Sequence, residues 1–97
     1  MHLVLLPQAK SDLKTMVAWI TRESGNGNVA RNFVAGIRKK CEQLASHPFQ
    51  MGSPRPDLDQ NIRSYVYGNY LILFRYTSDA MEVVMIVEGH RDIESLL

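Results

Sequence analysis

Apolar and polar residues follow a helical period in the first half of the chain. From Gln8 to about Glu23 the apolar positions recur every three or four residues, with lysine and aspartate on the opposite side, which predicts an amphipathic helix. A second stripe of the same spacing runs from Ala30 to Leu44 and predicts another helix, which ends at His47-Pro48. The glycines and asparagines of residues 24–28 separate the two stripes. We therefore expect an antiparallel helix hairpin whose second helix has Asn28 as its N-cap.

The other segments have the composition of strands and loops. His2–Leu6 is a short apolar run that predicts a first strand, and Pro7 suits the first turn of a helix. Residues 48–60 hold three prolines and one glycine, which indicates a loop. Three further strands are predicted at Ile62–Tyr67, Tyr70–Thr77 and Met81–Glu88, with turns at Gly68-Asn69 and at Ser78-Asp79-Ala80. Within the second of them, Leu71-Ile72-Leu73-Phe74 is apolar on both faces, as is typical of a central strand. We expect a short helical turn or an extended arm at His90–Leu97.

This order of elements predicts an α+β fold. An N-terminal strand, a two-helix antiparallel hairpin and a three-stranded antiparallel meander would place the helices on one sheet face. The other face would stay open to water or to a partner. The 97 residues suit a single domain, 1–97. Domains of this size bury only about 60–65% of their unfolded surface, so a partner is a natural cover for exposed apolar patches.

Charge is distributed unevenly along the chain. The net charge is +1, but residues 1–40 hold seven Lys/Arg and two Asp/Glu, whereas residues 41–97 hold four and eight. A near-neutral total argues against a protein whose main role is to bind the phosphate backbone of nucleic acid. The basic first half is either a surface for an acidic protein segment or a solvated helix face.

Cysteine use and hydropathy bear on the compartment. Cys41 is the one cysteine, which excludes an internal disulfide and indicates a reducing compartment. Its place in the helical stripe predicts a buried small hydrophobe, in preference to a catalytic thiol. No apolar run reaches the ~18 residues of a membrane span, and the N-terminus does not have the pattern of a signal peptide. We expect a cytoplasmic protein with no membrane contact.

No metal or cofactor site is expected. His2 and His47 have no metal-like spacing to each other or to Cys41. Asp57 and Asp59 flank Leu58, but a third ligand is not evident.

Several short motifs share their order and spacing with one known family. They are Ala9 with Asp12-Leu13; Leu44 with His47-Pro48; Gly52, Arg55 and Leu58 followed by Ile62-Arg63-Ser64; Gly68-Asn69-Tyr70-Leu71-Ile72; Phe74-Arg75-Tyr76; Glu82-Val83-Val84 with Ile86; and Arg91-Asp92-Ile93. Together they cover nearly the whole chain. On these fragments the chain resembles the ParE-type toxins of the RelE/ParE superfamily, also described as plasmid stabilisation proteins, which belong to bacterial toxin–antitoxin pairs.

The resemblance implies one of two activities. ParE-like members inhibit DNA gyrase by binding it, whereas RelE-like members are ribosome-dependent, metal-free mRNA endoribonucleases. The Gly68–Ile72 hairpin and the Arg91-Asp92-Ile93 ending look more like ParE. The near-neutral charge and the absence of tyrosine after Tyr76 count against RelE. The resemblance thus favours a gyrase inhibitor without catalytic residues, with a degenerate member that binds only its antitoxin as a third possibility.

Partners follow from the same resemblance. A ParD-like antitoxin of the ribbon-helix-helix type would neutralise the toxin in a hetero-oligomer, and operator DNA would be contacted only through that antitoxin. For antitoxin binding the candidates are Trp19, Arg31, Arg38 and Lys39.

Candidate target-binding residues lie on the open sheet face, the loop 52–61 and the tail. They are Arg55, Arg63, Arg75, His90 and Arg91. Arg63 and Arg75 have an alternative interpretation as internal ion pairs with Glu82 or Glu88. In the ribonuclease alternative, Arg63 and Arg75 would hold phosphate and His90 would transfer the proton. His90 is otherwise an exposed turn histidine.

Overall fold

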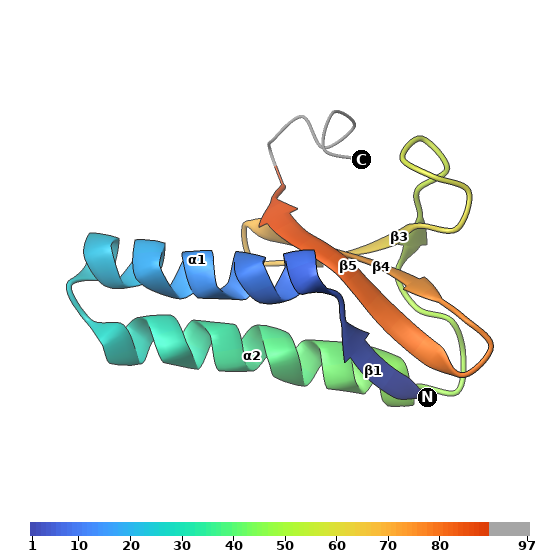
Figure 1. The fold of residues 1–97 in the computed structure, drawn as a ribbon, viewed down its shortest axis with the longest axis horizontal. Helices are drawn as coiled ribbons and strands as arrows, with labels where there is room; N and C mark the ends of the chain where they lie inside the picture. The colour runs from blue at the N-terminus through green and yellow to red at the C-terminus, as the bar shows by residue number, and fades with distance from the viewer. Residues whose placement is uncertain (90–97) are drawn as a thin grey trace.

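The fold is a helix hairpin packed against one face of a five-stranded sheet (Figure 1). The computed structural model describes residues 1–89. Its elements are β1 (His2–Leu5), α1 (Pro7–Ser24), α2 (Gly27–Ser46), β2 (Ser53–Pro54), β3 (Arg63–Tyr67), β4 (Tyr70–Tyr76) and β5 (Ala80–Glu88). The predicted α+β class, with helices on one sheet face, is confirmed. The predictions for the tail, including His90 and Arg91, lie outside the described residues.

The sheet has the order β1-β5-β4-β3-β2. The predicted antiparallel meander is confirmed in β3, β4 and β5. β1 pairs with β5 in parallel, so the first strand joins the last. The short strand β2 was not predicted from the loop sequence, because it contains only Ser53 and Pro54 and a proline counts against a strand. It pairs with the start of β3 at the sheet edge.

The two helices are joined by a turn that is shorter than predicted. Gly25 ends α1 in the left-handed conformation, with φ of 69°, and its N–H donates to the carbonyl of Thr21 at 2.8 Å. The N-cap of α2 is Asn26, whose Oδ1 accepts the N–H of Asn28 at 2.9 Å. The prediction of Asn28 as the cap was wrong by two residues, because Gly27 and Asn28 already belong to the first helical turn.

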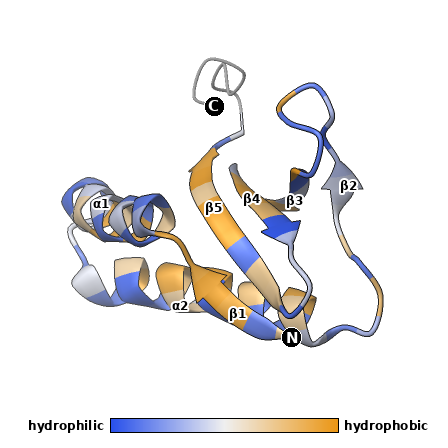
Figure 2. Cartoon of the chain, turned by 45° about the vertical axis from the view of Figure 1, so that its right-hand side comes forward, coloured by the Kyte–Doolittle hydropathy of each residue, from blue (hydrophilic) through white to orange (hydrophobic). Residues whose placement is uncertain are grey.

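Apolar residues form a large cluster between the helices and the sheet and a smaller one on the other side. The buried residues of the large cluster are Ala9, Leu13, Met16, Val34, Ile37, Cys41, Leu44, Ala45, Ile72, Phe74, Met81, Val83 and Ile86. The smaller cluster holds Ile62, Leu71, Leu73 and Val87. β4 contributes to both, which confirms the central-strand prediction. Cys41 is fully buried, as predicted. Figure 2 shows the apolar colouring concentrated along β1 and β5 and mixed around both helices.

Asp12 connects α1 to the sheet where β1 ends. The last contact of the β1 segment to β5 is the bond from the Leu6 N–H to the Val83 carbonyl at 3.0 Å. Farther along β5, the Ile86 N–H donates to Asp12 Oδ2 at 2.9 Å, and Gln8 Nε2 donates to Asp12 Oδ1 at 2.8 Å. A carboxylate thus takes the place of a strand carbonyl. In the described part of the chain, neither helix has the length and apolar character needed to cross a membrane.

Candidate functional site

Arg63 and Tyr76 hold the loop 50–54 against the end of the sheet. Arg63 Nε–H donates to the Met51 carbonyl at 2.7 Å, and Nη2 donates to the Gly52 carbonyl at 3.0 Å. The Met51 N–H donates to the Tyr76 hydroxyl oxygen at 2.9 Å. Gly52 has φ of 76°, and a Cβ there would lie 2.7 Å from both Phe74 Cζ and the Ser64 carbonyl. The loop is therefore fixed closely against β3 and β4.

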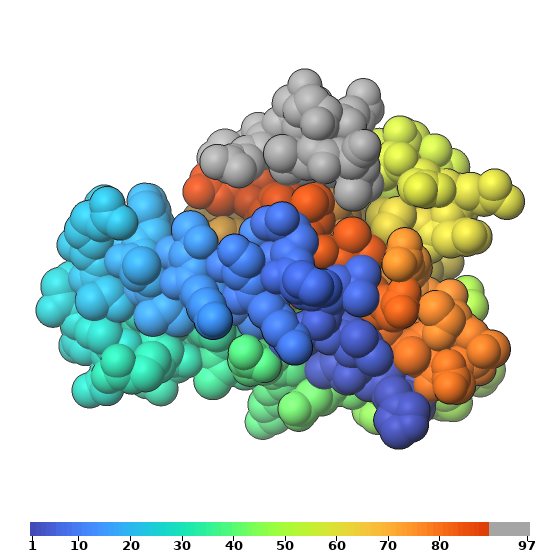
Figure 3. Space-filling model, viewed as in Figure 1, coloured from blue at the N-terminus to red at the C-terminus, as the bar shows by residue number. Residues whose placement is uncertain are grey.

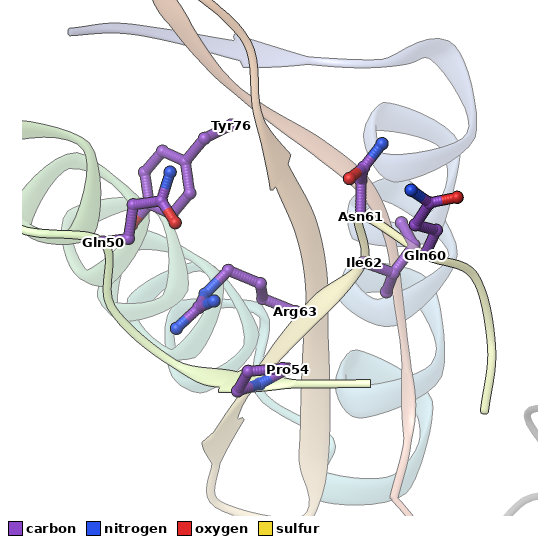
Figure 4. A pocket seen from close by; sticks show the side chains of 7 residues that line it. All are labelled: Gln50, Pro54, Gln60, Asn61, Ile62, Arg63 and Tyr76. Carbon is purple, nitrogen blue, oxygen red and sulfur yellow. The ribbon is translucent and has the colours of Figure 1, made fainter. Parts of the chain in front are cut away.

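A small polar hollow opens beside this clamp. We call it the Arg63 hollow; it has a volume of about 130 Å³ and is lined by Gln50, Pro54, Gln60, Asn61, Ile62, Arg63 and Tyr76. In Figure 4, Gln50 lies beside the Tyr76 ring on the side toward which the Arg63 guanidinium points. Gln60 and Asn61 enter from the opposite side on a second loop. Two loops and two strands thus meet at one arginine.

The other two described arginines of the predicted target surface are paired with carboxylates. Arg55 Nη2 lies 2.8 Å from Asp57 Oδ2, and its Nε–H donates to Oδ1 at 3.0 Å. The hydrogen bonds from Arg55 lower the pKa of Asp57 below its ordinary value. Arg75 Nε lies 2.7 Å from Glu82 Oε1, and the two residues are direct cross-strand neighbours. The internal ion pair predicted as one interpretation of Arg75 is confirmed. The same alternative fails for Arg63 within residues 1–89, because its Nε–H and Nη2 donate to backbone carbonyls and not to Glu82 or Glu88.

An apolar groove lies between α1 and the β3–β4 turn. One part, of about 440 Å³, is lined by Trp19, Ile20, Phe33, Gly68, Asn69, Tyr70 and Glu88. An adjoining part, of about 250 Å³, is lined by Asp12, Thr15, Met16, Trp19, Tyr70, Ile86, Val87 and Glu88. We call both together the Trp19 groove. Trp19 is 48% exposed, so a large indole surface is available to a partner.

Aromatic packing shapes the floor of the Trp19 groove. The Phe33 ring lies 5.5 Å from the Tyr67 ring and 5.7 Å from the Tyr70 ring. Burial, with a smaller contribution from the nearby Glu88 charge, raises the pKa of Tyr70 above its ordinary value.

The predicted basic residues of α2 lie apart from Trp19. Arg31, Arg38 and Lys39 are exposed, and none of them lines the Trp19 groove. Arg31 Nη2 donates to Asn28 Oδ1 at 2.7 Å. Figure 3 shows both helices as one continuous outer layer beside the orange surface of β5. The basic residues and the groove would therefore contact different parts of a partner.

Sequence reasoning missed most of the residues that surround Arg63 and Trp19. Gln50, Gln60 and Asn61 reach the Arg63 hollow from two loops, and Phe33 reaches the Trp19 groove from the other helix. No local sequence pattern predicts that these side chains lie near Arg63 or Trp19. The one usable signal was the exposed Gly68-Asn69 turn, which is a hairpin motif. Among residues 1–89, no three His, Cys, Asp or Glu side chains are grouped as a metal site requires.

Comparison with known proteins gives a family match and a structural match. The family model described as "ParE toxin of type II toxin-antitoxin system, parDE" matches residues 3–93. A solved structure titled "Chromosomal ParDE TA system from P. aeruginosa" superposes with a TM-score of 0.78 at 19% identity and covers 91% of this chain and 95% of that chain. At that identity the likeness concerns the fold alone. No curated protein matches the chain.

Proposed function

Because the chain belongs to the ParE toxin family of type II toxin–antitoxin systems, we propose that it acts by binding DNA gyrase and that a cognate antitoxin neutralises it. The observation that carries this proposal is the family match across residues 3–93. The toxin would act in the cytoplasm, without chemistry of its own. The antitoxin would be of the ParD-like, ribbon-helix-helix type.

The gyrase contact is best placed on the sheet face that is opposite the helices. Val66 is 66% exposed there, and the Arg75–Glu82 pair presents both charges, with side chains 44% and 24% exposed. The adjoining loop adds Arg55. His90 and Arg91 stay in the proposal on sequence grounds alone. A surface of exposed apolar and paired charged groups suits recognition of another protein.

The ribonuclease alternative is less well supported by the surroundings of its arginines. A metal-free ribonuclease would need Arg63 and Arg75 to hold phosphate. Arg63 is occupied by two backbone carbonyls and Arg75 by Glu82. Arg75 would have to leave Glu82 in order to bind phosphate, and Arg63 alone would supply a single positive charge to a phosphate dianion.

Purified toxin and gyrase test the proposal directly. We expect the toxin to inhibit supercoiling of relaxed plasmid, and we expect Val66→Asp on the exposed face to weaken inhibition about 10-fold or more. Lys14→Glu is the matched control, because Lys14 is exposed on α1 and its change should leave inhibition unaltered. Cleavage of mRNA in translating ribosomes, with supercoiling untouched, would overturn the proposal.

For the antitoxin we propose docking in the Trp19 groove. An amphipathic segment would place apolar side chains against Trp19 and Phe33, while its acidic residues would face Arg31, Arg38 and Lys39 on α2. Trp19 is the one tryptophan of the chain, so with a tryptophan-free antitoxin its emission reports on the groove. We expect a blue shift when antitoxin binds.

A matched pair of variants tests the placement. Trp19→Ala should weaken antitoxin binding about 100-fold in calorimetry, as removal of a central aromatic anchor does. Val29→Ala removes an apolar residue of the same 48% exposure that does not line the groove, and it should change affinity little. Equal effects of the two variants would exclude the groove as the main contact.

A further inference from the structure

We propose that the Arg63 hollow is a receptor for a single carboxylate group. The first reason is that no carboxylate among residues 1–89 neutralises the charge of Arg63. Its side chain is partly buried, and its hydrogen bonds within residues 1–89 go to the carbonyls of Met51 and Gly52. Carbonyl oxygens accept hydrogen bonds but carry no formal charge, so within residues 1–89 this partly desolvated cation has no carboxylate counter-ion. Arg55 and Arg75 differ, because each has a carboxylate within 2.8 Å.

The second reason is that neutral donors line both ends of the hollow, with Gln50 and Tyr76 on the side toward which the guanidinium points and Gln60 and Asn61 on the opposite side. The side-chain amides of Gln50, Gln60 and Asn61 line the hollow, and none makes a hydrogen bond to another described residue. The Tyr76 hydroxyl accepts from the Met51 N–H and keeps its own proton to donate. The neighbouring Asp59 does not line the hollow, and its Oδ1 accepts the N–H of Gln60 at 2.6 Å. An incoming anion would therefore meet donors on several sides.

The third reason concerns charge and size. One guanidinium balances one negative charge, and none of the other residues that line the hollow is charged. A phosphate dianion would need a second cation, whereas a carboxylate would be neutralised by Arg63 alone. The two oxygens of a carboxylate also match the fork of N–H donors on a guanidinium. The volume of about 130 Å³ admits a carboxylate and excludes a large ligand.

The carboxylate could come from a small molecule or from an Asp or Glu side chain of a partner protein. Binding to the hollow does not depend on gyrase being the target. A toxin that fails to inhibit gyrase can still bind a carboxylate, and the reverse also holds. The two proposals can therefore fail separately.

NMR of the arginine side chains tests the inference. The full chain, labelled with ¹⁵N, is titrated with sodium acetate while sodium chloride keeps the ionic strength constant. We expect a saturable shift of the Arg63 Nε–H and of the Asn61 and Gln60 side-chain amides, with a Kd in the millimolar range that suits a single ionic contact. The Nε–H groups of Arg55 and Arg75 are internal controls, since each already donates to a carboxylate. Equal, non-saturating shifts at all three arginines would overturn the proposal.

Variants and ligands sharpen the same titration. Asn61→Ala removes one exposed donor without touching the loop clamp and should weaken acetate binding about 3-fold or more, since one hydrogen bond to a charged group is lost. Ser78→Ala, in the exposed turn before β5, is the control and should have no effect. Phosphate should bind more weakly than acetate, and tighter binding of phosphate would overturn the assignment to a carboxylate.

Titrations with short peptides distinguish a small-molecule carboxylate from an Asp or Glu side chain of a partner protein. Blocked Gly-Gly-Glu-Gly-Gly is compared with acetate and with its Gln counterpart. Tighter binding of the Glu peptide, lost in the Gln peptide, would support a protein side chain as the source. Equal affinity of acetate and the Glu peptide would support a free carboxylate. Binding of the Gln peptide as tightly as the Glu peptide would overturn the proposal.

Discussion

The two faces of the sheet differ in what covers them. The face toward the helices carries a continuous buried cluster to which α1, α2, β4 and β5 all contribute. The opposite face carries a smaller cluster beside exposed Val66 and the Arg75–Glu82 pair. The helix-facing side thus supplies most of the burial that stabilises the fold. On the opposite side, exposed positions such as Val66 can change at little cost to the fold.

The largest expected effect comes from truncation on the helix-facing side. Phe74 is fully buried, and Phe74→Ala should lower the free energy of unfolding by about 3–5 kcal/mol. Val66→Ala on the opposite face should lower it by less than about 0.5 kcal/mol, because Val66 is 66% exposed. Urea denaturation of both variants measures the contrast. Similar losses would mean that the open face also supports the core.

Two glycines with similar backbone conformations give the next largest effect. Gly52→Ala should cost about 2–4 kcal/mol, because a left-handed alanine is strained and its Cβ would press on Phe74 and the Ser64 carbonyl. Gly25→Ala has the same kind of φ but nothing within 4 Å of the added Cβ, so the strain alone should cost about 1–2 kcal/mol. Thermal unfolding of both variants separates crowding from strain. An equal decrease in Tm for both variants would show that the loop 50–54 shifts to make room for the added Cβ.

Removal of the Asp12 carboxylate tests the bond between α1 and β5. Asp12→Ala leaves the Ile86 N–H without its acceptor and should cost about 1–3 kcal/mol. Asp12→Asn keeps one acceptor oxygen and should cost less. Hydrogen exchange at the Ile86 amide gives a local measurement. Unchanged protection in Asp12→Ala would show that the bond contributes little.

The exposed ion pair should matter least for stability at neutral pH. Arg75 and Glu82 are both partly exposed, and a double-mutant cycle with Arg75→Gln and Glu82→Gln should give a coupling of about 0.2–1 kcal/mol. Salt should weaken this coupling, since solvent screens exposed pairs. A coupling above about 2 kcal/mol would contradict an assignment to the solvated face.

Cys41 makes the stability of the fold depend on pH only in the alkaline range. Burial raises the pKa of its thiol from an ordinary value of 9.0 to about 11. The unfolded state therefore releases this proton first, and the contribution of the thiol to stability is full below pH 9 and is lost as the pH rises from about 9 to 11. At pH 8 the native thiol should resist alkylation and become reactive on unfolding. Fast labelling of folded protein would contradict this burial.

The elements could be predicted from the sequence because each carries a local pattern. The helix stripes, the Gly68-Asn69 turn and the doubly apolar β4 depend on neighbours within a few residues. The parallel pairing of β1 with β5 depends on residues at opposite ends of the chain, which no local pattern encodes. Asn26 and Asn28 are equally good caps by type, so the exact start of α2 could not be settled from composition.

The candidate site was harder to predict than the fold. Arg75 and Glu82 are seven positions apart and meet across a hairpin, so their pairing was accessible as one alternative. The partners of Arg63 are backbone carbonyls of a loop. Every residue has a backbone carbonyl, so the residue types in the sequence do not indicate which carbonyls Arg63 contacts. The Trp19 groove depends on Phe33 and Tyr70 arriving from two other elements.

The parallel contact between β1 and β5 has a consequence for synthesis of the chain on the ribosome. β1 is translated well before its hydrogen-bonding partner at Ala80–Val83, because both helices and three strands lie between them in the sequence. Such a contact cannot form while the polypeptide is still short, so completion of the sheet follows translation of β5. Any surface that depends on the assembled sheet therefore exists only after the ribosome has translated β5.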